Sequence, residues 1–152
     1  MTELPVSERL GSHLKRAEQA LSAAKNAALK QAGLTVSQYA ALMHLSANPG
    51  ISAAALARAC AVTPPTMNTV LKNLQEHGLV ERTPHEWHRN VLETRITEKG
   101  ARVLAAADPR AVRVERGLAA EFSPEERETL VALLGRCVTF LDAFRSAPDP
   151  EP

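Results

Sequence analysis

A polar run follows two consecutive prolines near the middle of the chain, in the stretch TPPTMNTVLKNLQEHGLVER from Thr63 to Arg82. Asparagine can form two hydrogen bonds with adenine, and threonine can offer its methyl to thymine or its hydroxyl to a base edge. Lysine suits contacts with phosphate. On a helix, one face of this run carries those residue types: Thr66, Asn68, Thr69, Lys72 and Asn73. This pattern is typical of a helix that enters the major groove of DNA.

The other face of the same run is apolar. Its apolar residues recur at i, i+3, i+4 and i+7, the spacing of a helix that packs on a core: Met67, Val70, Leu71 and Leu74. From the segment before it, Leu56, Ala57 and Cys60 can pack against them. A solvated polar face that binds nothing is the alternative interpretation of the outer side.

The two prolines fit the beginning of such a helix. Thr63 can act as the N-cap, which places Pro64 and Pro65 in the first turn, where backbone N–H groups have no partner within the helix. Thr63 and Pro65 then lie at the start of the exposed face and are predicted to contact DNA with the polar residues that follow. We predict a helix from about residue 64 to residue 77, ended by Gly78.

Two β-compatible segments, 79–83 and 91–96, come next and flank the polar stretch PHEWHRN, residues 84–90. This order predicts a hairpin with a polar tip. Arginine at the tip can reach a minor groove or a phosphate, and histidine can donate hydrogen bonds and change its charge near neutral pH. The tip residues predicted to reach DNA are His85, His88 and Arg89.

Long helices are predicted at both ends of the chain. In the first, over about 6–32, apolar residues recur at alternating steps of four and three, the spacing of a helix–helix seam, and they include Leu10, Leu14 and Leu21. The last begins at SPEE, residues 123–126, with serine as N-cap, proline next and glutamate third. It repeats the seam spacing at Leu130, Leu134 and Leu141. Both seams predict dimerisation.

Shorter helices fill the remaining sequence. The stretch TVSQ from Thr35 is a capping box that begins a helix ending near Ala47. Ser52 can cap a further short helix that runs to about Cys60, and it is also predicted to contact DNA. A helix from Thr97 is expected to be kinked or interrupted at Pro109, because proline removes a backbone donor and clashes with the preceding turn.

The predicted fold is mainly α with a small β-hairpin, a winged helix-turn-helix with N- and C-terminal dimerisation helices. We assign residues 1–34 and 118–146 to dimerisation. Residues 35–117 form the DNA-binding winged helix-turn-helix with its connecting helix, and 147–152 form a disordered tail because they lack core-forming side chains.

Composition sets limits on these expectations. The 152 residues are 45% hydrophobic and only 3% aromatic, so the core must be aliphatic. The formal net charge of +1 gives no general case for a nucleic-acid partner, and the segment from Ser52 to Lys99 has six basic and five acidic residues. No apolar run is long enough to cross a membrane and the N-terminus lacks a signal-peptide layout, so we expect a cytoplasmic protein without a membrane partner.

Four stretches together resemble the MarR family of winged-helix transcription regulators: LTVSQYAALMHL, ISAAALARACAVTPPTMNTVLKNLQEHGLVER, TRITEKGARVL and LAAEFSPEERETLVALLGR. The resemblance implies a homodimer joined by the first and last helices. It also implies binding to a pseudo-palindromic DNA operator, usually as a repressor released by a ligand or an oxidant. The implied recognition helix is about Pro64 to His77 and the implied wing is about Pro84 to Asn90.

The sequence departs from the family pattern at two places. The wing usually carries an Asp-x-Arg motif in which the aspartate orients the arginine, whereas residues 87–90 read WHRN. Members often have arginine at the position of Thr69 and another near Asn73, so this recognition helix is less basic than is common.

Three kinds of signal could regulate such a protein: a small molecule, an oxidant or a metal ion. A small-molecule effector is the default that the resemblance implies, with a pocket lined by residues such as Tyr39 and Met43. An oxidant sensor would need Cys60 or Cys137 to be exposed with a lowered pKa. A metal sensor would need more ligands than the scattered histidines supply, and we predict no metal or cofactor.

Other functional classes also stay open. A winged helix that binds protein instead of DNA is compatible with the near-neutral charge. Catalysis is not expected, because the sequence has no GxSxG, no P-loop, no GxGxxG and no paired carboxylates on opposed elements.

Overall fold

The computed structural model describes residues 4–147, so the predicted disordered tail lies outside the described residues except for Ala147. The chain divides into two compact units, one up to Val114 and one from Glu115 onward. No helix among residues 4–147 is long and apolar enough to cross a membrane.

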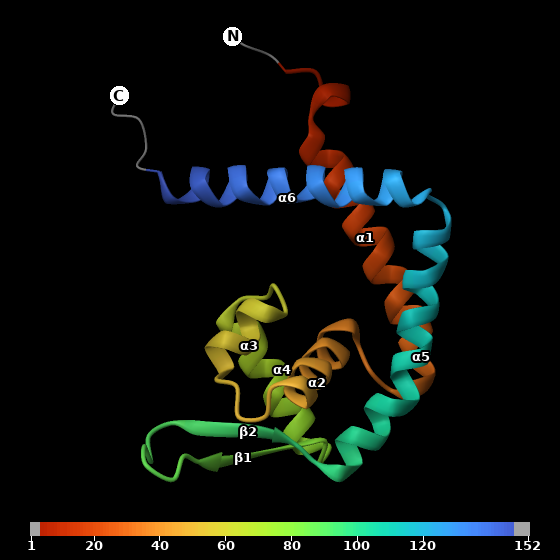
Figure 1. The fold of residues 1–152 in the computed structure, drawn as a ribbon. Helices are drawn as coiled ribbons and strands as arrows, with labels where there is room; N and C mark the ends of the chain where they lie inside the picture. The colour runs from red at the N-terminus through yellow and green to blue at the C-terminus, as the bar shows by residue number, and fades with distance from the viewer. Residues whose placement is uncertain (1–3, 148–152) are drawn as a thin grey trace. The chain divides into compact units, whose positions relative to one another are not determined.

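The first unit contains all the elements up to the long fifth helix, as Figure 1 shows by colour along the chain. Its helical elements are η1 (Val6–Glu8), α1 (Leu10–Leu29), η2 (Lys30–Ala32), α2 (Val36–Ala47), α3 (Ala53–Ala59), α4 (Pro64–Glu76) and α5 (Glu98–Ala120), the last of which runs on into the second unit. The first helix was predicted as a single piece, whereas the structure has 3-10 turns at both of its ends.

The helix starts are set by local capping, as the sequence predicts. The Thr35 hydroxyl accepts a hydrogen bond from the Gln38 backbone N–H, and the Gln38 side chain accepts one from the Thr35 N–H, which completes a capping box. The Ser52 hydroxyl caps α3 and the Thr63 hydroxyl caps α4. Each cap satisfies a backbone donor that has no partner within its own helix.

The core of this unit is aliphatic and lies where α2, α3 and α4 meet. Side chains with almost no exposure come from each helix: Leu42, Leu45, Leu56, Met67, Leu71 and Leu74. The predicted apolar face of α4 is thereby confirmed, with Val70 packed at its margin. Burial of each such side chain stabilises the fold by roughly 1.5–3 kcal/mol, which fixes the orientation of α4 and leaves its other face exposed.

The hairpin follows α4 directly (Figure 1). Strands β1 (Val80–Pro84) and β2 (Leu92–Ile96) pair antiparallel, with Val80 opposite Ile96 and Pro84 opposite Leu92. Both strands begin one residue later than predicted. Gly78, with a φ of 70°, ends α4 in the left-handed region and turns the chain into β1.

Helix α5 corrects one prediction. It continues from Glu98 to Ala120 with Pro109 inside it, so the predicted interruption is wrong. Proline costs a helix interior roughly 3 kcal/mol, but Ala107 and Ala111 on either side of it are buried against the core. This packing holds both flanking turns in helical conformation.

Gly100 in the first turn of α5 allows the helix to contact the hairpin. A Cβ at this position would collide with the backbone carbonyl of Leu79 and with the Ile96 side chain. We expect Gly100→Ala to lower the free energy of unfolding by about 1–3 kcal/mol, as overpacking does, measured by chemical denaturation.

Gly117 in the same helix is the matched control, because a Cβ there would meet nothing within 4 Å. Gly117→Ala should be neutral or stabilise the protein by up to about 1 kcal/mol through helix propensity alone. Equal effects of the two substitutions would contradict the close contact between Gly100 and Leu79.

The second unit contains α6 (Pro124–Ser146), which begins with the predicted capping box between Ser123 and Glu126. None of its residues is buried. Its large apolar side chains remain exposed along one side of the helix: Leu130, Val131, Leu133, Leu134, Val138, Phe140, Leu141 and Phe144. At 100° per residue these positions cover about half the circumference, an apolar face that this unit does not cover.

Candidate nucleic-acid interface

Helix α4 presents the polar face that the sequence predicts. Its buried residues Met67, Leu71 and Leu74 lie on one side, so residues on the other side point away from the core. All but one of the predicted contact residues on this helix are exposed: Pro65, Thr66, Asn68, Thr69 and Lys72. Ser52 and Thr63 are exposed too, at the N-caps of α3 and α4.

The threonine hydroxyls on this surface are partly committed to the helix itself. Thr63 caps α4 and donates to the Thr66 hydroxyl at 2.9 Å. The Thr69 hydroxyl donates to the Pro65 carbonyl at 3.2 Å. Such local bonds restrict the side chains and use the hydroxyl hydrogens of Thr63 and Thr69. The contacts of these threonines with DNA stay predictions.

Asn68 and Lys72 carry the polar groups that remain available. The Asn68 amide forms no hydrogen bond with another side chain among residues 4–147, and the residue is exposed. The Lys72 ammonium lies 4.0 Å from the Glu76 carboxylate, with 78% of its side chain exposed. An exposed pair at this distance holds the lysine only weakly, so Lys72 can turn toward a phosphate.

Asn73 lies at the edge of the polar face and is half-buried. Its Oδ1 accepts a hydrogen bond of 2.6 Å from Gln38 Nε2. The same Gln38 side chain completes the capping box of α2, so this one residue links the first turn of α2 to the last turn of α4. The bond engages the amide oxygen of Asn73, whose contact with DNA stays a prediction.

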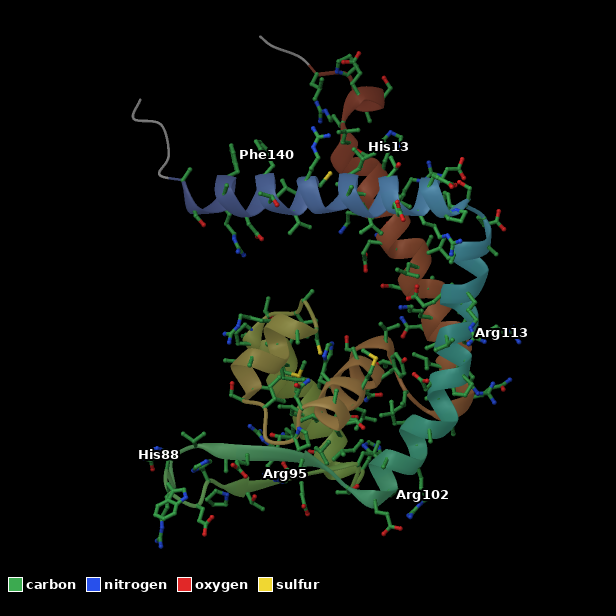
Figure 2. The ribbon with its side chains drawn as sticks, viewed as in Figure 1. His13, His88, Arg95, Arg102, Arg113 and Phe140 are labelled. Carbon is green, nitrogen blue, oxygen red and sulfur yellow. The ribbon has the colours of Figure 1, made fainter. Side chains whose placement is uncertain are left out.

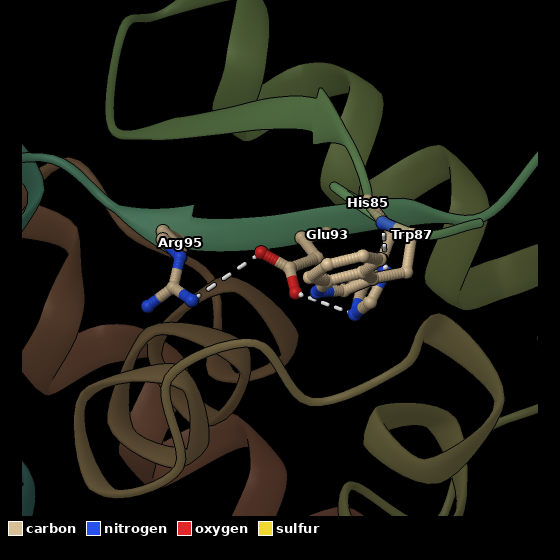
Figure 3. Close-up of polar contacts among 4 residues, drawn as sticks. All are labelled: His85, Trp87, Glu93 and Arg95. Carbon is tan, nitrogen blue, oxygen red and sulfur yellow. Dashed lines mark hydrogen bonds and ion pairs between the residues drawn. The ribbon is translucent and has the colours of Figure 1, made fainter. Parts of the chain in front are cut away.

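The hairpin contains a polar cluster, shown in Figure 3, that the sequence did not predict. The Glu93 carboxylate on β2 lies between two basic side chains, 3.3 Å from Arg95 Nη2 and 3.3 Å from His85 Nε2. Glu93 is the better shielded partner, with 25% of its side chain exposed. It supplies a carboxylate to a wing that lacks the aspartate of the family motif.

His85 connects this cluster to the tip of the hairpin. Its Nδ1 accepts a hydrogen bond of 3.2 Å from the Trp87 backbone N–H. Because Nδ1 acts as an acceptor, the proton of the neutral ring belongs on Nε2, which faces Glu93. The His85 ring also stacks on the ring of His88, with centroids 5.6 Å apart, and Figure 2 places His88 at the far end of the hairpin.

The tip itself is open to solvent. Trp87 has 81% of its surface exposed, and His88 and Arg89 are exposed as well. A large aromatic ring, an imidazole and a guanidinium therefore gather on one turn. A narrow groove edged by phosphates would accommodate side chains of these kinds. Trp87 joins His88 and Arg89 on this exposed surface, and contact of the tip with DNA stays a prediction.

Sequence reasoning missed Gln38, Trp87 and Glu93. Gln38 was assigned to the capping box alone, and its second partner lies 35 residues away. The alternation of residues along a strand indicates which face Glu93 lies on. It does not indicate which side chain Glu93 contacts across the hairpin. For Trp87 a signal was present, since a tryptophan within a polar turn has no core to fill.

Metal binding and thiol oxidation are the other two kinds of site that the sequence raised. No group of three or more His, Cys, Asp or Glu side chains among residues 4–147 is placed to hold a metal ion. Cys60 and Cys137 are both free and half-buried. Burial raises the pKa of the Cys60 thiol, the opposite of the shift that a redox-sensing cysteine needs.

We therefore expect Cys60 to react slowly. In a Cys137→Ser variant, alkylation of Cys60 by iodoacetamide at neutral pH should be slower than that of a free cysteine, and its rate should rise only at a pH above the usual cysteine range. The measurement is the alkylated fraction by mass spectrometry over time. Rapid alkylation near pH 7 would show that the thiol is exposed and activated instead.

The sequence and the fold were compared with those of known proteins. The model of the MarR family matches residues 32–89, which include α2, α3, α4 and β1. A relative in Mycobacterium tuberculosis, the HTH-type transcriptional repressor Rv2887, is 39% identical over 121 residues, covering 78% of this chain and 86% of the relative.

Two solved structures are similar along most of the chain. The transcriptional repressor CouR bound to a 23-mer DNA duplex is 29% identical, with a TM-score of 0.78, and the match covers 90% of this chain and 99% of CouR. Rv2887 in complex with p-aminosalicylic acid is 29% identical, with a TM-score of 0.65 over 88% of this chain and 98% of that one. With its winged helix-turn-helix and these relatives, the chain belongs to the MarR family of transcription regulators.

Proposed function

We propose that the protein is a homodimeric repressor that binds a pseudo-palindromic DNA operator through α4 and the hairpin tip. The observation that carries this proposal is the exposed face of α4, a helix held firmly by its buried face. On that face the Asn68 amide is unengaged, and Lys72 is paired only weakly with Glu76 at 4.0 Å. The hairpin adds Trp87, His88 and Arg89 as a second contact. The similarity to CouR, which has been solved on a DNA duplex, supports this docking.

Dimerisation is proposed to use the apolar sides of α1 and α6. Leu10 is 70% exposed, Leu141 is 54% exposed and Leu134 is 42% exposed, while Leu14 and Leu21 are half-buried. Phe140 and Phe144 stack along the same helix with ring centroids 6.0 Å apart. Apolar surface of this extent is costly in water and typical of an interface between subunits.

A small aromatic acid is proposed as the signal that releases the operator. Rv2887, the relative described above, has been solved with salicylic acid and with p-aminosalicylic acid. The raised pKa of the half-buried Cys60 thiol argues against this cysteine as an oxidant sensor. We propose that the protein acts by binding alone, without catalysis, in keeping with relatives that are named as repressors and regulators.

Selection of bound duplexes from a random pool tests the proposal. A homodimer that inserts one α4 per half-site should enrich an inverted repeat whose half-site centres lie about 10 base pairs apart, one helical turn of DNA, or a multiple of it. Enrichment of a single half-site, or of no sequence, would contradict it.

A further inference from the structure

The end of the hairpin carries more apolar surface than a solvated turn needs. Trp87 is exposed there, and so are Val91 and Leu92, where the chain enters β2. Trp87 is the single tryptophan of the 152 residues. Large apolar side chains that gather at one exposed place mark a binding surface, so the hairpin end is expected to contact a partner.

This end of the hairpin is held in shape by hydrogen bonds. The His85 N–H donates to the Val91 carbonyl at 2.7 Å, and the Val91 N–H donates to the His88 carbonyl at 2.8 Å. The Trp87 N–H donates to His85 Nδ1 at 3.2 Å, and His85 Nε2 lies 3.3 Å from the Glu93 carboxylate, as Figure 3 shows. The backbone of Trp87 is thus fixed from Glu93 through His85, which lowers the cost of ordering the turn on binding.

Charge contributes little at this turn. Over residues 84–90, Arg89 is offset by Glu86, and both are exposed, so the full charges cancel when the histidines are neutral. Attraction of the turn to phosphates is therefore weak. The indole offers the larger contribution, because loss of one aromatic ring that stacks on a base usually lowers affinity about 5- to 150-fold.

The hairpin is placed to reach the groove next to the one that α4 would occupy. A helix fits the major groove, which is about 12 Å wide, and the neighbouring minor groove lies half a helical turn away, about five base pairs. The hairpin follows α4 directly, and its turn lies beyond the helices α2, α3 and α4 of the same unit (Figure 1). Trp87 would therefore lie at the minor groove beside each half-site.

We propose that Trp87 is a wedge that inserts its indole into this minor groove and partly unstacks a pyrimidine–purine step. Steps of this kind, TA and CA/TG, are the easiest to unstack, and apolar side chains kink DNA in this way. Glu93 is the positioning residue, because it holds the turn through His85. The inference rests on the proposed binding of an operator by α4 and the hairpin tip.

The wedge selects DNA by deformability and not by a pattern of hydrogen bonds. An arginine-led contact would have the opposite preference, because arginine is attracted to the narrow minor groove of stiff A-tracts. The operator selected from a random pool should therefore carry a TA or CA/TG step about five base pairs from the centre of each half-site.

Intrinsic fluorescence tests the insertion directly, because Trp87 is the only tryptophan. The full-length protein is titrated with the selected operator, and its emission is measured with and without acrylamide. An indole that stacks on bases should lose emission and become protected from acrylamide. An indole that stays in solvent should change in neither respect.

Operator affinities test the selectivity. Replacement of the flanking step by AA should weaken binding of the wild-type protein about fivefold or more. Trp87→Ala should weaken binding to the original operator about fivefold or more and should bind both duplexes equally. Trp87→Phe keeps an aromatic ring and should retain most of the discrimination. Met43→Ala, which removes an exposed apolar side chain from α2, should behave as the wild type.

Glu93 is tested by the same pair of duplexes. Glu93→Ala should reduce the discrimination between them towards that of Trp87→Ala. Glu93→Gln should restore it, since the amide oxygen can still accept a hydrogen bond from His85 Nε2. The loss of affinity caused by Asn68→Ala should be the same in all these backgrounds, whereas a general structural defect would change it.

Several results would overturn the wedge while leaving the proposed function intact. These are operator binding with Trp87 still open to acrylamide, undiminished affinity of Trp87→Ala, and a selected operator with A-tracts in place of the flexible step. Discrimination by Glu93→Ala equal to that of the wild type would overturn the role of Glu93. A protein that binds none of the selected duplexes would overturn the proposed function and the wedge together.

Discussion

Replacement of Asn68 by alanine should lower affinity for the operator about tenfold or more, because a bidentate bond to adenine contributes roughly 1–3 kcal/mol of discrimination. Affinity for random duplex DNA should stay within about twofold, since non-specific binding depends on phosphate contacts that Asn68 does not make. The basis is the position of Asn68, exposed on α4 with its amide unengaged. The measurement is fluorescence anisotropy with the selected operator and with a scrambled duplex.

Asn48 provides the matched control for this substitution. It is an exposed asparagine in the turn after α2, where its amide donates to the His44 carbonyl at 3.3 Å. Asn48→Ala should leave both affinities unchanged. An equal loss on operator and scrambled DNA for Asn68→Ala would mean that Asn68 does not read a base.

A second large effect is expected at the apolar side of α6. Leu134→Glu should raise the dimer dissociation constant about 100-fold or more, because it places an unpaired charge in an apolar interface. The two-fold symmetry of a homodimer introduces the charge twice. Sedimentation velocity over a range of concentrations measures this change, and operator affinity should fall with it because each subunit alone reaches one half-site.

Ala132→Glu is the control for the dimer prediction. Ala132 is also exposed on α6, but at 100° per residue it points away from the apolar face that contains Leu134. It should leave the dimer intact. A wild-type-like dimer mass for Leu134→Glu would show that this side of α6 is not the interface.

Local interactions explain why so much of the fold is predictable. The caps at Thr35, Ser52, Thr63 and Ser123 form over three residues, so the sequence shows them directly and the structure confirms all four. The apolar face of α4 follows from helical spacing alone. The two prolines after Thr63 occupy the first turn of α4, as predicted.

Interactions between distant residues explain what was not predicted. Whether α5 tolerates Pro109 depends on the burial of its neighbours and not on its own propensity. The Gln38–Asn73 bond spans 35 residues, and Glu93 reaches His85 across the hairpin. Sequence spacing indicates which face of an element is polar, but the partner of each side chain depends on packing.

The salt dependence of operator binding tests the central claim most directly. A dimer that places two α4 helices and two hairpin tips on the duplex should contact several phosphates. The logarithm of its affinity should therefore fall linearly with the logarithm of salt concentration, with a slope of about −4 or steeper. A slope near zero would contradict a phosphate-contacting regulator, and would favour a winged helix that binds protein, as the formal net charge of +1 alone permits.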